Sequence, residues 1–181
     1  MLMILMTGLS GAGKTTLAEG LRSKLAAMNI SAEVIDGDVY RKTINQDLGF
    51  SAEDRRGNIK RLARFANEKS LKGIITIIAA INPFEDIRVE LSKQYGAKII
   101  WVRCNLSTLI ARDTKGLYYK ALLPDDHPDK LRNLTGINDP YEMPVHSDLI
   151  IDTSEDTIEN SAQQLFNYIV LLLSLSQTNF I

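Results

Sequence analysis

The chain has 181 residues, the length of one ordinary domain, and its 45% hydrophobic and 24% charged residues are typical of a globular protein that folds without a structural metal. A single cysteine, Cys104, excludes an internal disulfide framework and any metal site built from several thiolates. The net charge of −1 provides no overall field that would attract nucleic acid or an anionic membrane. We therefore expect one cytoplasmic domain over residues 1–181 that binds small molecules, not nucleic acid or a membrane.

Short apolar runs alternate with longer amphipathic segments, a pattern typical of βα units around a parallel sheet. Strands are predicted at residues 2–6, 32–35, 74–81, 98–102 and 148–151. Helices are predicted at residues 14–28, 51–71 and 155–175. The pattern indicates an α/β fold with a five-stranded parallel sheet between two layers of helices. In such a fold, ligands bind at the carboxyl ends of the strands.

The sequence pattern does not by itself assign a role to two segments, 112–136 and 155–175. Between residues 112 and 136 the alternation breaks, and two prolines, Pro124 and Pro128, stand among charged side chains. A long segment without clear elements in a compact domain is typical of a functional lid, so we predict a mobile lid at about 112–136. The apolar terminal helix, 155–175, is expected either to pack in the core or to form the face of a homodimer.

A complete phosphate-binding motif, G-x-x-x-x-G-K-T, joins the first predicted strand to the first helix at residues 8–15. Glycines let backbone N–H groups turn toward phosphates, and the following helix places its positive end there. The Lys14 ammonium can reach the terminal phosphates, and the Thr15 hydroxyl can bind Mg²⁺. The motif predicts that a nucleotide is held by Gly8, Ser10, Gly11, Ala12, Gly13, Lys14, Thr15 and Thr16.

The class of nucleotide-binding protein depends on what accompanies this motif. A GTP-binding switch would need a base-reading Asn-Lys-x-Asp segment, which the sequence lacks. A motor ATPase normally ends an apolar strand in an acidic residue, whereas the run 74–81 is followed by Asn82 and Pro83. The size of the chain and its lid favour a small-molecule kinase that uses ATP and Mg²⁺. A non-catalytic nucleotide-binding module is the alternative.

Two carboxylates, Asp36 and Asp38, follow the second predicted strand and so face the same crevice as the phosphate-binding loop. One can hold Mg²⁺ or its waters, and the other can accept a proton from a substrate hydroxyl. Taken by itself, the segment could also be an Asp-Gly turn with a helix cap at Asp38. Arg41, on the following turn, can pair with an anionic group of a substrate.

Further candidate side chains surround the start of the predicted helix 51–71. Arg55 and Asn58 are three residues apart and therefore share one face of that helix. Phe50, in the loop before the helix, is either a core residue or a platform on which a base stacks.

These motifs occur together over most of the chain, in the same order as in one known protein family. The matching stretches are residues 8–16, 36–38 with Arg41, 47–51 with Asp54, Arg55 and Asn58, 112–113 with 115–118 and 120–121, and 135–137 with 140–142 and Pro144. With them the chain resembles the adenylyl-sulfate kinases, which use ATP to phosphorylate the 3′-hydroxyl of adenosine 5′-phosphosulfate. The resemblance implies a three-layer P-loop kinase fold.

The resemblance also implies a role for each matching residue. Asp38 would be the catalytic acidic residue, with Lys14 at the transferring phosphate, and Asp36 would lie with Thr15 near the metal. Arg112 and Lys115 would belong to the lid, Arg112 on the ATP side and Lys115 on the acceptor side. The residues implied at the acceptor substrate are Asp36, Arg41, Phe50, Arg55, Asn58, Lys115 and Leu134. Of these, Arg41, Arg55 and Asn58 would hold the phosphosulfate and ribose end, and Phe50 would stack on the adenine.

Three residues depart from the family pattern, and all three would lie near the acceptor. Asn82 and Glu85 stand where the family has serine and arginine in a Ser-Pro-(Tyr/Phe)-Arg pattern, and Leu134 stands where the family has an aromatic residue. Adenosine 5′-phosphosulfate is the leading acceptor. The alternative is another nucleotide conjugate, such as a cytidine diphosphate derivative, with Leu134 shaping a smaller slot.

Overall fold

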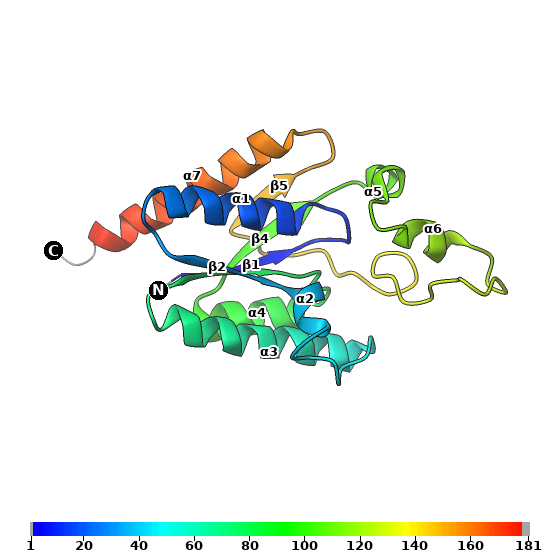
Figure 1. Ribbon diagram of the computed structural model, residues 1–181. Coiled ribbons are helices and arrows are strands. Elements are labelled where there is room, and N and C mark those ends of the chain that lie inside the picture. The colour runs from blue at the N-terminus through cyan, green and yellow to red at the C-terminus, as the bar shows by residue number, and fades with distance from the viewer. Residues whose placement is uncertain (1, 179–181) are drawn as a thin grey trace.

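The computed structural model describes residues 2–178, within which five strands alternate with seven helices (Figure 1). The strands are β1 (Met3–Thr7), β2 (Ala32–Asp36), β3 (Ile75–Ala79), β4 (Lys98–Arg103) and β5 (Leu149–Asp152). The helices are α1 (Lys14–Ala27), α2 (Gly37–Arg41), α3 (Ala52–Ser70), α4 (Glu85–Tyr95), α5 (Leu106–Arg112), α6 (Leu117–Leu122) and α7 (Ile158–Thr178). All neighbouring strands are parallel, in the order β2-β3-β1-β4-β5, which confirms the predicted sheet.

Helices cover both faces of the sheet, so the domain has three layers, with α1 and α7 on one face and α3 and α4 on the other (Figure 1). Successive residues of a strand point to opposite faces, and β1 shows this directly. Ile4 and Met6 join the core beneath α1 and α7, whereas Met3 and Leu5 join the core beneath α3 and α4. Strands β1 and β3 are buried along their whole length, which explains their nearly continuous apolar sequences.

Helix α4 is missing from the sequence prediction because its buried face is not purely apolar. Ile87 and Leu91 face the core at helical spacing, but Arg88 lies beside them with only 1% of its surface exposed. A buried arginine interrupts the hydrophobic periodicity by which an amphipathic helix is recognised.

The segment 112–136 contains the short helix α6, which the sequence analysis also does not predict. Tyr118 of α6 is buried, and its hydroxyl donates a hydrogen bond to the carbonyl oxygen of Ser10 at 2.8 Å. Burial raises the pKa of Tyr118 to about 12, so this hydroxyl keeps its proton at neutral pH. The segment is thereby attached to the phosphate-binding loop. Its mobility stays a prediction.

The terminal helix α7 packs along α1 on the outer face of the domain (Figure 1). Leu165 and Ile169 are fully buried in the core, while Leu171 and Leu175 are exposed. The expectation that this helix packs in the core is therefore confirmed for one of its sides. The homodimer stays a prediction. Within residues 2–178, no helix is both long and apolar enough to cross a membrane.

Candidate active site

A cavity of about 710 Å³ lies at the carboxyl ends of the strands, a volume in the range of small-molecule sites. The predicted site residues that line it are Ser10, Gly11, Ala12, Gly13, Lys14, Thr15, Thr16, Asp36, Asp38, Phe50, Arg55, Arg112, Lys115 and Leu134. Gly8, Arg41 and Asn58 are not part of its lining. The fold thus brings the donor-side and acceptor-side candidates to one space.

The path of the phosphate-binding loop depends on its glycines. At Gly8, which has φ +149°, an added Cβ would lie 2.2 Å from the carbonyl oxygen of Val102 on β4. Gly13 has φ +93° and precedes the first residue of α1. The loop therefore passes close to the sheet and directs the N-terminus of α1 toward the cavity, where a helix favours an anion.

Lys14 lies at the floor of the cavity, and its Nζ donates hydrogen bonds to the carbonyl oxygens of Gly8 at 2.8 Å and Leu9 at 2.7 Å. Burial lowers the pKa of Lys14 from 10.5 to about 8, although the nearby charge of Asp38 opposes the shift. A buried ammonium held by neutral carbonyls gains strongly from a nearby anion, as a phosphate would provide.

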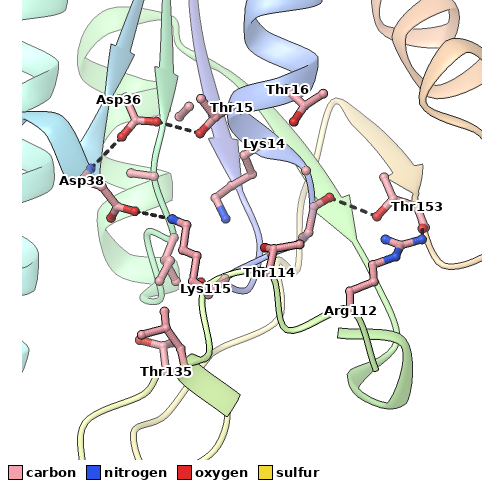
Figure 2. A pocket seen from close by; sticks show the side chains of 18 of the residues that line it. Lys14, Thr15, Thr16, Asp36, Asp38, Arg112, Thr114, Lys115, Thr135 and Thr153 are labelled. Carbon is pink, nitrogen blue, oxygen red and sulfur yellow. Dashed lines mark hydrogen bonds and ion pairs between the residues drawn. The ribbon is translucent and has the colours of Figure 1, made fainter. Parts of the chain in front are cut away.

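Thr15 and Asp36 meet at the cavity wall, as Figure 2 shows, where Thr15 Oγ1 donates to Asp36 Oδ2 at 2.6 Å. Asp36 Oδ1 accepts hydrogen bonds from the N–H groups of Asp38 and Val39, so Asp36 is the N-cap of α2. The helix cap is therefore at Asp36 and not at Asp38, the position that the simple turn interpretation gave it.

The oxygens of Thr15 and Asp36 fit the preference of Mg²⁺, which takes one or two protein oxygens and keeps several waters. Within residues 2–178, no group of three or more His, Cys, Asp or Glu side chains is arranged to hold a metal ion.

Asp38 lies opposite Lys14 and forms an ion pair with the lid, in which Lys115 Nζ lies 2.6 Å from Asp38 Oδ2 (Figure 2). Burial by itself would raise the pKa of Asp38, but the hydrogen bond and charge of Lys115 hold that pKa below its usual value. Asp38 is therefore a carboxylate at neutral pH, the form that accepts a proton.

Phe50 and Leu134, two residues predicted at the acceptor, contribute apolar side chains to the lining of the cavity. Phe50 is 53% exposed and lines the cavity, so it is not a core residue. Arg41 lies behind it, with its guanidinium carbon 4.8 Å from the ring centroid and its Nη1 donating to the carbonyl oxygen of Gly49. Leu134 is 5% exposed.

Arg55 lines the cavity, yet most of its hydrogen-bonding groups are engaged by the protein. Its Nε donates to the carbonyl oxygen of Phe50 at 3.0 Å, and its Nη1 donates to Thr135 Oγ1 at 2.9 Å. Its Nη2 donates to the carbonyl oxygen of Asn133 at 2.7 Å and to Asp139 Oδ2 at 2.6 Å.

Asn58 is also engaged by the protein. Its side chain is buried, and its Oδ1 accepts a hydrogen bond from Asn45 Nδ2 at 2.9 Å. This contact ties α3 to the loop that follows α2. Asn58 is not part of the cavity lining.

Neither Asn82 nor Glu85 lines the cavity, and the structure explains the departure at Glu85 but not the one at Asn82. Glu85 Oε2 accepts a hydrogen bond from Arg88 Nε at 2.7 Å, and Arg88 Nη1 donates to the carbonyl oxygen of Asn82. The acidic residue at position 85 is therefore the counter-ion of the buried Arg88.

Thr153, just after β5, is a cavity residue that the sequence analysis missed. Its hydroxyl donates to the carbonyl oxygen of Ala12 at 3.0 Å, and its carbonyl oxygen accepts a hydrogen bond from Arg112 Nη2 at 2.7 Å. Thr153 thus connects the lid to the phosphate-binding loop. The sequence could have indicated Thr153 as a site residue, because it follows the carboxyl end of a predicted strand.

Comparisons with known proteins agree with this geometry. A family model described as adenylylsulphate kinase matches residues 1–152. The adenylyl-sulfate kinase of Microcystis aeruginosa is 39% identical over 163 residues, covering 90% of this chain and 87% of the relative. That of Chloroflexus aurantiacus is 42% identical over 153 residues, covering 84% and 80%. The structure of the Mycobacterium tuberculosis APS kinase CysC in complex with AMPPNP and APS superposes with a TM-score of 0.85 at 32% identity, over 93% of this chain and 96% of the other.

Proposed function

The chain belongs to the adenylylsulphate kinase family, and from this premise we propose that it transfers the γ-phosphoryl group of ATP to the 3′-hydroxyl of adenosine 5′-phosphosulfate. The reaction class is that of an ATP-dependent kinase acting on a hydroxyl group. The observation that carries the acceptor assignment is the single cavity in which the Lys14 loop and the Asp38 carboxylate lie with the Phe50 platform.

The half of the cavity that would hold ATP is lined by the phosphate-binding loop together with Arg112 and Thr153. Backbone N–H groups at the start of α1 would bind the phosphates, and Lys14 would turn from the carbonyls of Gly8 and Leu9 to the transferring group. Thr15 and Asp36 would hold Mg²⁺, which when bound neutralises charge on the β- and γ-phosphates.

The acceptor hydroxyl needs a proton acceptor as its oxygen attacks phosphorus. Asp38, ionised and beside Lys14, would take that proton as the new O–P bond forms and ADP leaves. It must first release Lys115, which would then be free to pair with the anionic end of the acceptor. Phe50 would stack on the adenine, with Leu134 forming the opposite wall.

The decisive test is a transfer assay with ATP and Mg²⁺ over a panel of acceptors, with the Lys14→Ala variant as the inactive control. We expect turnover of adenosine 5′-phosphosulfate. Turnover of a cytidine diphosphate derivative without turnover of adenosine 5′-phosphosulfate would contradict the assignment and favour the smaller slot at Leu134. No transfer to any acceptor, with intact ATP binding, would favour the non-catalytic module. A cytoplasmic location and a homodimer remain predictions of the sequence.

A further inference from the structure

A short strap, residues 113–117, joins α5 to α6 and carries Lys115 to the cavity. Lys115 Nζ lies 2.6 Å from Asp38 Oδ2, as Figure 2 shows. The Lys115 side chain is 53% exposed, so surrounding side chains do not hold it in place. A long exposed side chain has many accessible rotamers, and an ion pair between two exposed groups contributes little. The position of the Lys115 ammonium group therefore depends on the path of the strap.

The strap begins at a fixed point. Arg112, the last residue of α5, donates a hydrogen bond from Nη2 to the carbonyl oxygen of Thr153 at 2.7 Å (Figure 2). The Thr153 hydroxyl in turn donates to the carbonyl oxygen of Ala12 at 3.0 Å. The first end of the strap is therefore attached to the phosphate-binding loop through the residue that follows β5.

The strap ends next to Tyr118, the second residue of α6. Tyr118 is 2% exposed and belongs to the same hydrophobic core as Leu109 of α5. Its hydroxyl donates to the carbonyl oxygen of Ser10 at 2.8 Å, and a buried acceptor that loses its donor is costly. The second end of the strap is therefore also attached to the phosphate-binding loop, and Tyr118 makes that attachment.

Asp113 closes the strap on itself. Its Oδ1 accepts a hydrogen bond from the N–H of Tyr118 at 3.0 Å, and its Oδ2 accepts one from the N–H of Tyr119 at 2.8 Å. The N–H of Gly116, which has φ +64°, donates to the carbonyl oxygen of Asp113 at 2.9 Å. Because the strap is a tight, internally hydrogen-bonded turn, a displacement of Tyr118 is passed directly to Lys115.

The phosphate-binding loop is the more firmly held side of the contact between Tyr118 and Ser10. Lys14 Nζ donates to the carbonyl oxygens of Gly8 and Leu9, and the backbone at Gly8 lies close against β4. Loss of the Tyr118 hydrogen bond should therefore displace the strap and leave the loop in place.

We propose that Tyr118 is a positioning residue, which holds Lys115 in the cavity by fixing the strap to the phosphate-binding loop. This inference rests on the proposed function, because it takes Lys115 as the group that pairs with the anionic end of the acceptor. Tyr118 does not line the cavity, so it acts through Lys115 and not by contact with a ligand. A group that is already held where its ligand needs it avoids the cost of being ordered on binding.

The Tyr118→Phe variant keeps the buried ring and removes only the hydrogen bond to Ser10. In transfer assays with ATP and adenosine 5′-phosphosulfate, we expect KM for the acceptor to rise roughly tenfold, as it would if the competent position of Lys115 were populated about one-tenth of the time. Both kcat and KM for ATP should stay near wild type. Tyr119→Phe is the matched control, because Tyr119 is the next residue of α6, is 68% exposed and does not line the cavity. It should change none of these constants.

A double-mutant cycle separates positioning from a general structural role. In a Lys115→Met background, Tyr118→Phe should raise KM for the acceptor no further, because the group that it positions is gone. A general loosening of the fold would add the same factor in either background. Asp113→Asn, which removes one of the two acceptors that close the strap, should give the same two results. It replaces Tyr118→Phe if circular dichroism shows that Tyr118→Phe is not folded.

The outcomes are distinct. An unchanged KM for the acceptor in Tyr118→Phe would overturn the proposal, and so would an equal rise in the presence and absence of Lys115. A rise in KM for ATP alone would make Tyr118 a support of the phosphate-binding loop and overturn the proposal as well. A wild-type protein that does not transfer phosphate to adenosine 5′-phosphosulfate would instead refute the proposed function, and this inference with it.

Discussion

The ion pair between the buried Arg88 and Glu85 on α4 allows the effect of a substitution on stability to be worked out from the structure. Arg88 is 1% exposed, and its guanidinium donates to Glu85 Oε2 at 2.7 Å and to the carbonyl oxygens of Asn82 and Glu142 at 2.7 and 2.6 Å. Arg88→Met would leave the Glu85 carboxylate and both carbonyls without this donor. Because the Glu85 side chain is 20% exposed and can be hydrated, the loss should lie below the figure for a fully buried pair, at about 2–3 kcal/mol in the free energy of unfolding. For a chain of this length, that corresponds to a melting temperature lower by roughly 4–12 °C.

Urea and thermal unfolding of Arg88→Met, Glu85→Gln and the double variant would measure this effect. Because the two side chains interact directly, the double variant should be less destabilised than the sum of the single variants, by about 0.5–3 kcal/mol. Arg56→Met is the control, since Arg56 pairs with Asp86 at 3.0 Å but its side chain is 33% exposed. That variant should lose no more than about 1 kcal/mol. An Arg88→Met protein as stable as this control would refute the reasoning.

Four further predictions concern the cavity. Asp38→Asn should lower kcat more than acceptor affinity in steady-state kinetics, because the amide cannot accept a proton; a rise in KM without a fall in kcat would make Asp38 a binding residue. ADP binding measured by calorimetry should weaken as the pH rises through about 8, because Lys14, with a pKa of about 8, then loses the charge that attracts phosphate. Lys14→Met should abolish this loss above pH 8, and an unchanged loss in that variant would assign it to another group. Phe50→Ala should weaken binding of adenosine 5′-phosphosulfate by about 1–3 kcal/mol, whereas Leu134→Phe should leave it equal or tighter, and the opposite order would indicate that the base lies elsewhere. Amide hydrogen exchange across 117–134 should slow when nucleotide and acceptor are both bound, and equal protection in the free and bound protein would indicate a fixed segment.

The sequence determined the features that depend on local pattern. The parallel sheet follows from apolar runs alternating with amphipathic ones, and the phosphate-binding site follows from glycines and Lys14 at fixed spacing between a strand and a helix. Asp36 and Asp38 could be placed opposite that loop because parallel strands end at one edge of a sheet. Helix α4 escaped prediction because the buried Arg88 interrupts its hydrophobic periodicity, and α6 escaped because its six residues are too few to establish one.

The tertiary structure decided which charged and polar side chains remain available to a ligand. From the sequence, Arg55 and Asn58 are polar groups on one helix face expected near the acceptor, and Glu85 is an acid where the family pattern has an arginine. In the fold, Arg55 is engaged by a turn about 80 residues later, Asn58 by Asn45, and Glu85 by the buried Arg88. These partners depend on how distant segments pack, and a buried polar group must find a partner wherever the chain path supplies one. Spacing along the chain therefore predicts which chemical groups reach the cavity edge, but only the packing determines which of them the protein itself has already bound.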